Sequence, residues 1–345
     1  MEKDVDSRFS STLKTWYALR EFETHDITSH SYKSRHALKL SAAKAREVSS
    51  NFIQAREYFN SASRADFTVR PLLLYYGVAS LSRGVTLFLA PEKRETSLRP
   101  SHGLETCEWG QDLSRGLNAI GTLRVRVSKG LFHDLLVATN NRFYFRHNTS
   151  EVNCSLGADI PPVGSEFGLQ EITARIPAVS DQYFAWTRKP SSSIVPEALQ
   201  QDTAKGLYQI TVPKREVEEI DSVFPSEHFP GRSVVEDGNK IIVELDNADG
   251  LFFAQRVGWW SIGDIVLYRP LQSQLYVSPL AACFIISFIL GMLCRYFPAT
   301  WINSARTEKG DAFYPLATVL LDWIEEVFPV MVVDVLRSPY GFETT

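Results

Sequence analysis

Two long amphipathic helices are predicted between Ser49 and Leu104, and this stretch constrains the fold more than any other part of the chain. Apolar residues recur at steps of three and four through both of its halves, as they do on one face of a helix. The positions are Val48, Phe52, Ala55, Phe59 and Ala62 in the first helix and Leu74, Val78, Leu81, Val85 and Phe88 in the second.

Two prolines bound the second helix. Pro71 suits its first turn, because the missing N–H has no helical partner there, and Pro91 with the charged run after it marks the end. A connection of about half a dozen residues favours antiparallel packing of the two helices. Each large side chain buried between them contributes about 1.5–3 kcal/mol, so we expect this pair to be a folding nucleus.

The composition bounds the size of the fold and argues against one class of function. The chain has 345 residues, of which 44% are hydrophobic, and this length fits one large domain or two closely packed ones. Its net charge of −4 is unlike that of a strongly basic nucleic-acid-binding protein, although a local basic patch stays open.

The cysteines and the motifs predict neither a disulfide framework nor a cofactor. Cys107, Cys154, Cys283 and Cys294 are widely spaced and form no CxxC pair, which is typical of reduced thiols in a cytoplasmic protein. The N-terminus lacks the apolar segment of a secretion signal. No phosphate-binding glycine loop, dinucleotide motif, nucleophile elbow or HExxH metal motif occurs, so we expect no metal and no cofactor.

The segment from Leu275 to Cys294 is uncharged and just long enough to span a bilayer. Ser278-Pro279 is a typical helix start, which leaves about sixteen residues of helix before Arg295. No basic cluster flanks the segment. We therefore expect a buried core helix and no membrane span.

The remaining sequence predicts an α+β fold, a mainly helical bundle of N- and C-terminal segments with a central β-containing insertion. A helix is expected over residues 9–22, followed by a polar break over 23–35, and the C-terminal part returns to helix. Strands are expected at 122–127, 143–145, 207–212 and 265–268, with a hairpin around Asp237-Gly238 and a short charged helix at 214–224. The boundaries that follow are 1–105, 106–275 and 276–345.

Two blocks of sequence resemble the YaaC-like family of bacterial proteins. They comprise Ala55-Arg56, Phe59, Ala65-Asp66, Arg70 to Gly84 and His102-Gly103-Leu104, then Ser278-Pro279-Leu280, Arg295-Tyr296, Pro298 and Trp301. The family has no settled activity, so the resemblance implies little about mechanism.

A fold-level likeness to HEPN-type helical domains is also present, in the Tyr75-Tyr76 pair near a helix start and in the later His102-Gly103. It implies a helical bundle that often dimerises and is a ribonuclease in some members. The Arg–His spacing of those nucleases occurs only as Arg20/His25, Arg126/His133 and Arg142/His147, none of them in a predicted long helix. Whether the chain is an enzyme therefore stays open.

Four polar residues stand in otherwise apolar surroundings and are the candidate site. We expect Arg83, Arg295 and Arg70 to bind an anion or phosphate, and His102 to be the acid–base candidate, if the helices converge. The alternative is structural, with the arginines paired to Asp66, to Glu57 or to backbone carbonyls at helix ends. Tyr75 and Tyr76 are expected in the core. Trp259-Trp260 is either a base-stacking platform or a buried anchor.

Two functions follow as hypotheses. The first is a cytoplasmic binding protein of the YaaC-like type without a settled catalytic activity, acting as a homo-oligomer or beside a protein partner. The alternative is a HEPN-like protein directed at RNA, or a ribonuclease, in stress or phage defence.

Overall fold

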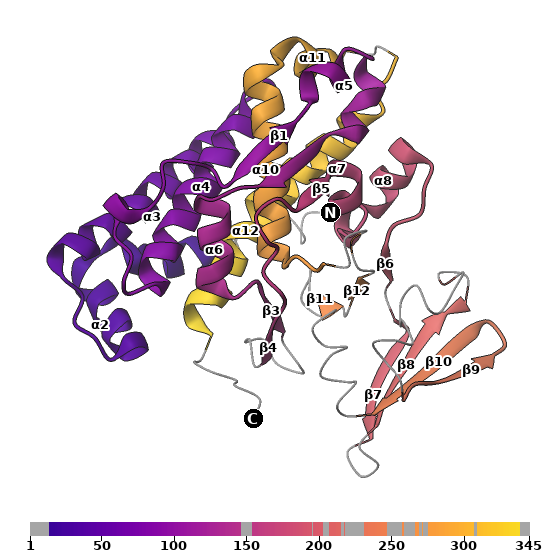
Figure 1. Cartoon of the computed structure of the whole chain (residues 1–345), viewed down its shortest axis with the longest axis horizontal. Helices are drawn as coiled ribbons and strands as arrows, with labels where there is room; N and C mark the ends of the chain where they lie inside the picture. Colours follow the sequence, from indigo (N-terminus) through magenta and orange to yellow (C-terminus); the bar gives the residue numbers. More distant parts are fainter. Residues whose placement is uncertain are drawn as a thin grey trace.

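The structure is a computed structural model with an α+β, mainly helical fold, as predicted (Figure 1). Long helices from both ends of the chain form the body, and a four-stranded sheet lies at the end far from the N-terminal helices (Figure 1). The structure describes residues 14–145, 154–194, 196–202, 207–214, 217, 231–246, 257–258, 266–268, 271, 275–306 and 309–338. The expected helix at 214–224 and Trp259-Trp260 lie outside the described residues, apart from residues 214 and 217.

The two helices predicted from the apolar periodicity are α3 (Ala42–Ala62) and α4 (Arg70–Leu89). A Cβ atom on Gly77 would lie 2.8 Å from the ring of Phe59, and one on Gly84 would lie 2.8 Å from the ring of Phe52. The order of these contacts is reversed along the two helices, so α3 and α4 run antiparallel. The glycines let the helices approach closely enough for the phenylalanine rings to lie against the backbone of α4.

Helix α10 (Pro279–Tyr296) lies in the centre of the fold, and all of its residues from 279 to 294 are buried. Its predicted cap is confirmed, since Ser278 Oγ accepts a hydrogen bond from the N–H of Ala281 at 3.3 Å. It packs on α4 and on α12 (Phe313–Arg337). Among the described residues, α4 and α10 are long and apolar enough to cross a membrane, but 67% and 89% of their apolar windows are buried inside the protein.

The polar break predicted at 23–35 is wrong, because helix α2 (His25–His36) occupies most of it. Only Thr28 and Tyr32 of this helix are buried, so its sequence shows almost no apolar stripe. The helix ends at Ala37, which adopts a left-handed backbone conformation with φ 52°. Helix 14–20 and the 3₁₀ turn η1 (Glu21–Glu23) precede it, in agreement with the predicted N-terminal helix over the part that is described.

The strands among the described residues form four small antiparallel sheets, and each predicted strand that is described is present. The first sheet is β1 (Leu104–Cys107), β2 (Arg124–Val127) and β5 (Glu166–Gly168), and the second is β3 (Arg142–Phe145) with β4 (Cys154–Gly157). The third is β7 (Ala198–Asp202), β8 (Leu207–Pro213), β10 (Lys240–Asp246) and β9 (Ser233–Asp237), and the fourth is β11 (Val257–Gly258), β12 (Val266–Tyr268) and β6 (Ser193–Ile194). The hairpin predicted at Asp237-Gly238 joins β9 to β10, and Gly238 has φ +57°.

Short helices cover the space between these strands and the long helices. They are η2 (Glu95–Ser97), α5 (Trp109–Leu113), η3 (Leu117–Thr122), α6 (Leu131–Thr139), α7 (Leu169–Thr173), η4 (Pro177–Val179), α8 (Ser180–Thr187) and α11 (Pro298–Asn303). Helix α6, which the sequence did not predict, packs on both α4 and α10. One cluster of buried side chains runs from the N-terminal helices through β1, β2 and β5 to α12. The three-part division at 105 and 275 stays a prediction.

Candidate functional site

Three of the four candidate residues lie around one buried tyrosine. Arg83 comes from α4, Arg295 from the last turn of α10, and His102 from the loop between η2 and β1. The Oη atom of Tyr75, also on α4, lies 2.5 Å from Nδ1 of His102. The charges of Arg83 and Arg295 act on both Tyr75 and His102, so the structure brings the predicted set together.

The position of Tyr75 follows from the packing of α4 on α10. Its side chain is fully buried, and its ring lies edge-on to Phe284 and Phe288. A Cβ atom on Gly291 would lie 2.7 Å from the Cβ of Tyr75, so the absence of a side chain on α10 makes room for the tyrosine. The phenol is therefore fixed by two helices far apart in sequence.

The position of His102 is fixed by its backbone. The carbonyl oxygen of His102 accepts a hydrogen bond from the N–H of Phe132 at the start of α6, at 2.9 Å. Gly103 follows with φ +79°, and a Cβ there would lie 2.6 Å from the nitrogen of Phe132. A residue with a side chain does not fit this tight approach, which explains the His102-Gly103 pair in the sequence.

The two arginines differ in exposure, since Arg295 is exposed and Arg83 is half-buried. Arg295 donates from Nη1 to Oη of Tyr76 at 3.0 Å, and its guanidinium lies 5.0 Å from the ring centroid of Tyr296. Arg83 is half-buried and forms no hydrogen bond or ion pair with any residue that the structure describes. No carboxylate among the described residues pairs with Arg295.

Burial sets the protonation states at the site. It raises the pKa of Tyr75, so the phenol keeps its hydrogen at physiological pH. Burial, followed by the positive charges of Arg295 and Arg83, lowers the pKa of His102, so the imidazole is neutral there. The site thus consists of two positive guanidinium groups beside a neutral imidazole and a neutral phenol, which is an arrangement suited to an anion.

Arg70, the fourth candidate, lies apart from the other three. Its Nη1 and Nη2 atoms pair with Asp322 at 2.7 Å and Glu325 at 2.6 Å, both on α12. Arg70 therefore joins the start of α4 to the C-terminal helix. The structural alternative therefore describes this arginine, but its partners are carboxylates of α12 and not the expected Asp66 or Glu57.

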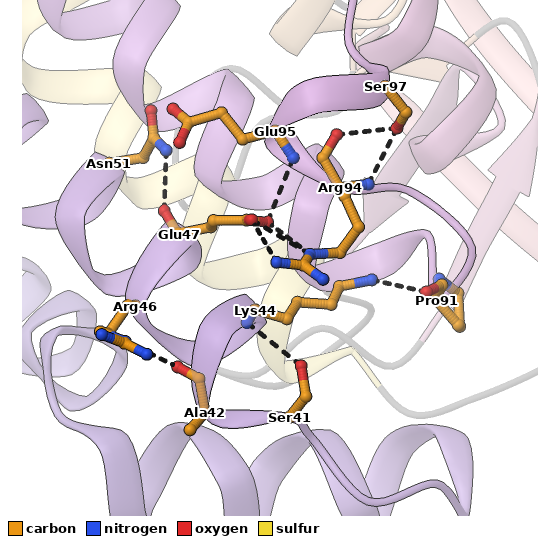
Figure 2. A network of polar contacts seen from close by, with 10 residues as sticks. All are labelled: Ser41, Ala42, Lys44, Arg46, Glu47, Asn51, Pro91, Arg94, Glu95 and Ser97. Atoms are coloured by element: carbon orange, nitrogen blue, oxygen red, sulfur yellow. Dashed lines mark hydrogen bonds and ion pairs between the residues drawn. The ribbon is translucent and has the colours of Figure 1, made fainter.

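A second polar network, which the sequence analysis missed, closes the other end of α4 (Figure 2). Lys44 is 4% exposed and donates to the carbonyl oxygens of Ala90 at 2.7 Å and Pro91 at 2.8 Å. Glu47 beside it binds Arg94 at 2.6 Å (Figure 2). Burial lowers the pKa of Lys44 to about 8. The partners of Lys44 are carbonyls just beyond the end of α4, and that of Ala90 also accepts from the N–H of Lys93 at 3.1 Å, so this network is structural.

Metal-binding groups are not gathered in the described part of the chain. No three histidine, cysteine, aspartate or glutamate side chains lie close enough there to hold an ion. Cys107, Cys283 and Cys294 are free thiols.

Comparison with known proteins gives the family. The model of the family described as YaaC-like Protein matches residues 17–336. A search of curated proteins and a search of solved structures found no match. The matched range includes both sequence blocks and every residue of the site. The chain belongs to the YaaC-like family.

Proposed function

We propose that the protein is a binding protein whose ligand carries a phosphate or a similar oxyanion, held by Arg83, Arg295 and His102. The observation that carries the proposal is the pair of guanidinium groups beside a neutral imidazole, with no described carboxylate paired to either. Each guanidinium offers planar donors that match the oxygens of a phosphate. An anion between the two also offsets their mutual repulsion.

The test is a calorimetric titration with inorganic phosphate. Removing either arginine as Arg83→Gln or Arg295→Gln should weaken binding about 10- to 100-fold, because a charge-assisted hydrogen bond contributes about 1.5–3 kcal/mol. Arg64→Gln is the matched control, since Arg64 is exposed and makes no ion pair with a described residue. The control should bind phosphate as the wild type does. Equal affinities in all four proteins would refute the proposal.

The alternative function is an RNA-directed protein or ribonuclease of HEPN-like type, in stress or phage defence. One specific observation favours it: Tyr296, beside Arg295, is 60% exposed and offers a ring for a base next to a phosphate site. Incubation with total RNA, with and without magnesium, tests it. Cleavage by the wild type that is lost in His102→Ala, at an unchanged melting temperature, supports the ribonuclease. No cleavage by a folded wild type leaves the binding function.

The protein is also proposed to act in the cytoplasm as a homo-oligomer or beside a protein partner, with α10 in its core and not in a membrane. Exposed apolar side chains support a contact surface, among them Phe184 and Val235, each 52% exposed. Sedimentation velocity and native pull-down test this. A strictly monomeric mass together with no stoichiometric partner contradicts it.

A further inference from the structure

We infer that Tyr75 donates its hydroxyl hydrogen to Nδ1 of His102 and so fixes the His102 tautomer with hydrogen on Nε2. The site is then a set of hydrogen-bond donors, which suits an oxyanion whose contacting oxygens bear no proton. This inference rests on the proposed function, because it names the chemistry of the ligand at the same site. It concerns Tyr75 as a positioning residue that acts through His102.

The first step is the direction of the hydrogen bond. The Oη atom of Tyr75 lies 2.5 Å from Nδ1 of His102 and forms no other hydrogen bond with a described residue. The tyrosine is fully buried, among Phe284, Phe288 and Gly291. If Nδ1 carried the hydrogen, the buried hydroxyl would have to leave its own hydrogen without a described acceptor, which is unfavourable. The hydroxyl is therefore the donor.

The second step is the tautomer. A neutral imidazole carries one hydrogen, on Nδ1 or on Nε2. Because Nδ1 of His102 accepts from Tyr75, the hydrogen is on Nε2. The Nε2 atom makes no hydrogen bond with a residue that the structure describes, and the side chain is only partly buried. His102 thus presents a free N–H donor.

The third step concerns the other hydrogen-bonding groups around His102. Arg83 and Arg295 act on His102 from α4 and α10 and offer only N–H groups. Tyr76 accepts from Arg295, so its own hydroxyl hydrogen is free to donate. Apart from the remaining lone pair of the Tyr76 hydroxyl, these groups offer only donors to a ligand. A fully ionised oxygen, as in a phosphodiester, a phosphate dianion or a sulfate, satisfies all the donors, whereas a protonated oxygen leaves one donor facing another.

The tautomer also limits the role of His102 in any reaction. A base needs an unprotonated nitrogen facing the substrate, and the only unprotonated nitrogen here faces the buried Tyr75. His102 is consequently a donor to the ligand in the resting state and not a base.

The test combines tautomer measurement by nitrogen-15 nuclear magnetic resonance with sulfate titration. Sulfate is the probe because it stays a dianion across the pH range used, so any pH dependence of binding comes from the protein. His36 is an internal reference, since its Nε2 lies 2.9 Å from the carbonyl oxygen of Phe88 and carries hydrogen in every variant. The charged and titratable groups that face His102 are Arg83, Arg295 and Tyr75, and burial raises the pKa of Tyr75, so its phenol keeps its hydrogen between pH 6 and 8.

In the wild type, we expect the Nε2–H tautomer for His102 and a sulfate affinity that changes less than about twofold between pH 8 and 6. In Tyr75→Phe, Nδ1 of His102 loses its donor, so the Nδ1–H tautomer becomes available, whereas burial and the charges of Arg295 and Arg83 still lower the pKa of His102. We therefore expect a detectable Nδ1–H fraction in this variant and a sulfate affinity about two- to fivefold lower at pH 8, because that fraction has no N–H facing the ligand.

An Nδ1–H tautomer in the wild type overturns the inference, even if sulfate binds. A Tyr75→Phe variant that keeps both the tautomer and the sulfate affinity of the wild type overturns it too. Absence of sulfate binding by a wild type with the Nε2–H tautomer overturns the proposed function and supports the tautomer assignment. If Tyr75→Phe does not fold, the wild-type tautomer alone decides.

Discussion

Gly291 connects the packing of the fold to the geometry of the site, and its replacement by alanine tests that connection. An alanine Cβ would lie 2.7 Å from Cβ, 3.1 Å from Cγ and 3.3 Å from Cδ1 of Tyr75. The first of these atoms belongs to a rigid part of the side chain, so α4 and α10 have to separate. Overpacking of this kind costs about 1–3 kcal/mol.

Helix propensity acts in the opposite direction. Replacing glycine by alanine in a helix interior stabilises by about 0.8–1 kcal/mol. Gly110→Ala is the matched control, because Gly110 also lies in a helix, α5, and a Cβ there meets nothing within 4 Å. The control should gain stability of this size or stay neutral. Gly291→Ala should therefore be about 1–3 kcal/mol less stable than Gly110→Ala.

The assay is urea unfolding monitored by circular dichroism. The two variants are compared if the unfolding free energy has the same dependence on urea concentration in both. Phosphate affinity measured in parallel should fall in Gly291→Ala and not in Gly110→Ala, since Tyr75 and His102 move with the helices. Equal stability of the two variants would refute the account of α4–α10 packing. A loss of stability with unchanged phosphate affinity would separate the packing from the site.

Three further predictions concern charged groups. Arg70→Gln should destabilise by about 1–3 kcal/mol in urea unfolding, because Glu325 is then left part-buried without its partner; a double change that also removes Glu325 should recover part of the loss, and no recovery would argue against the pair. Lys44→Met should cost about 1–3 kcal/mol, because the carbonyl of Pro91 loses its side-chain donor; an unchanged melting temperature would contradict this. The folded pKa of His102 is below the ordinary 6.5, so its contribution to stability is full above pH 6.5 and is lost as the pH falls through the lowered pKa. The free energy of unfolding should therefore depend less on pH between about 7 and 5 in His102→Asn than in the wild type, and identical slopes would refute it.

The sequence predicts the helices whose apolar faces repeat over many turns. Helices α3 and α4 each bury a regular stripe, and α10 is apolar all round because it is surrounded by protein. Helix α2 was missed because it buries only Thr28 and Tyr32, and its polar residues are compatible with a loop. The nine residues of α6 are too short and too uniformly apolar for periodicity to separate helix from strand.

The sequence predicts which polar residues belong to the site but not how they lie in space. Arg83, His102 and Arg295 stood out as polar residues in apolar surroundings, whereas Tyr75 looked like an ordinary core residue. Its bond to His102 depends on how closely α4 approaches α10, and that distance is set by Gly291 on the other helix. The partner of Arg70 was out of reach for the same reason, since Glu325 is 255 positions away.

The most direct test of the anion site is a crystal grown with selenate, which resembles sulfate in shape and whose selenium is located by its anomalous signal. The account predicts a peak in contact with Arg83 and Arg295, with Nε2 of His102 within hydrogen-bond distance of a selenate oxygen. It also predicts that this peak is absent in crystals of Arg83→Gln/Arg295→Gln. No peak at this position in the wild type, with both guanidinium groups paired to carboxylates, would contradict it.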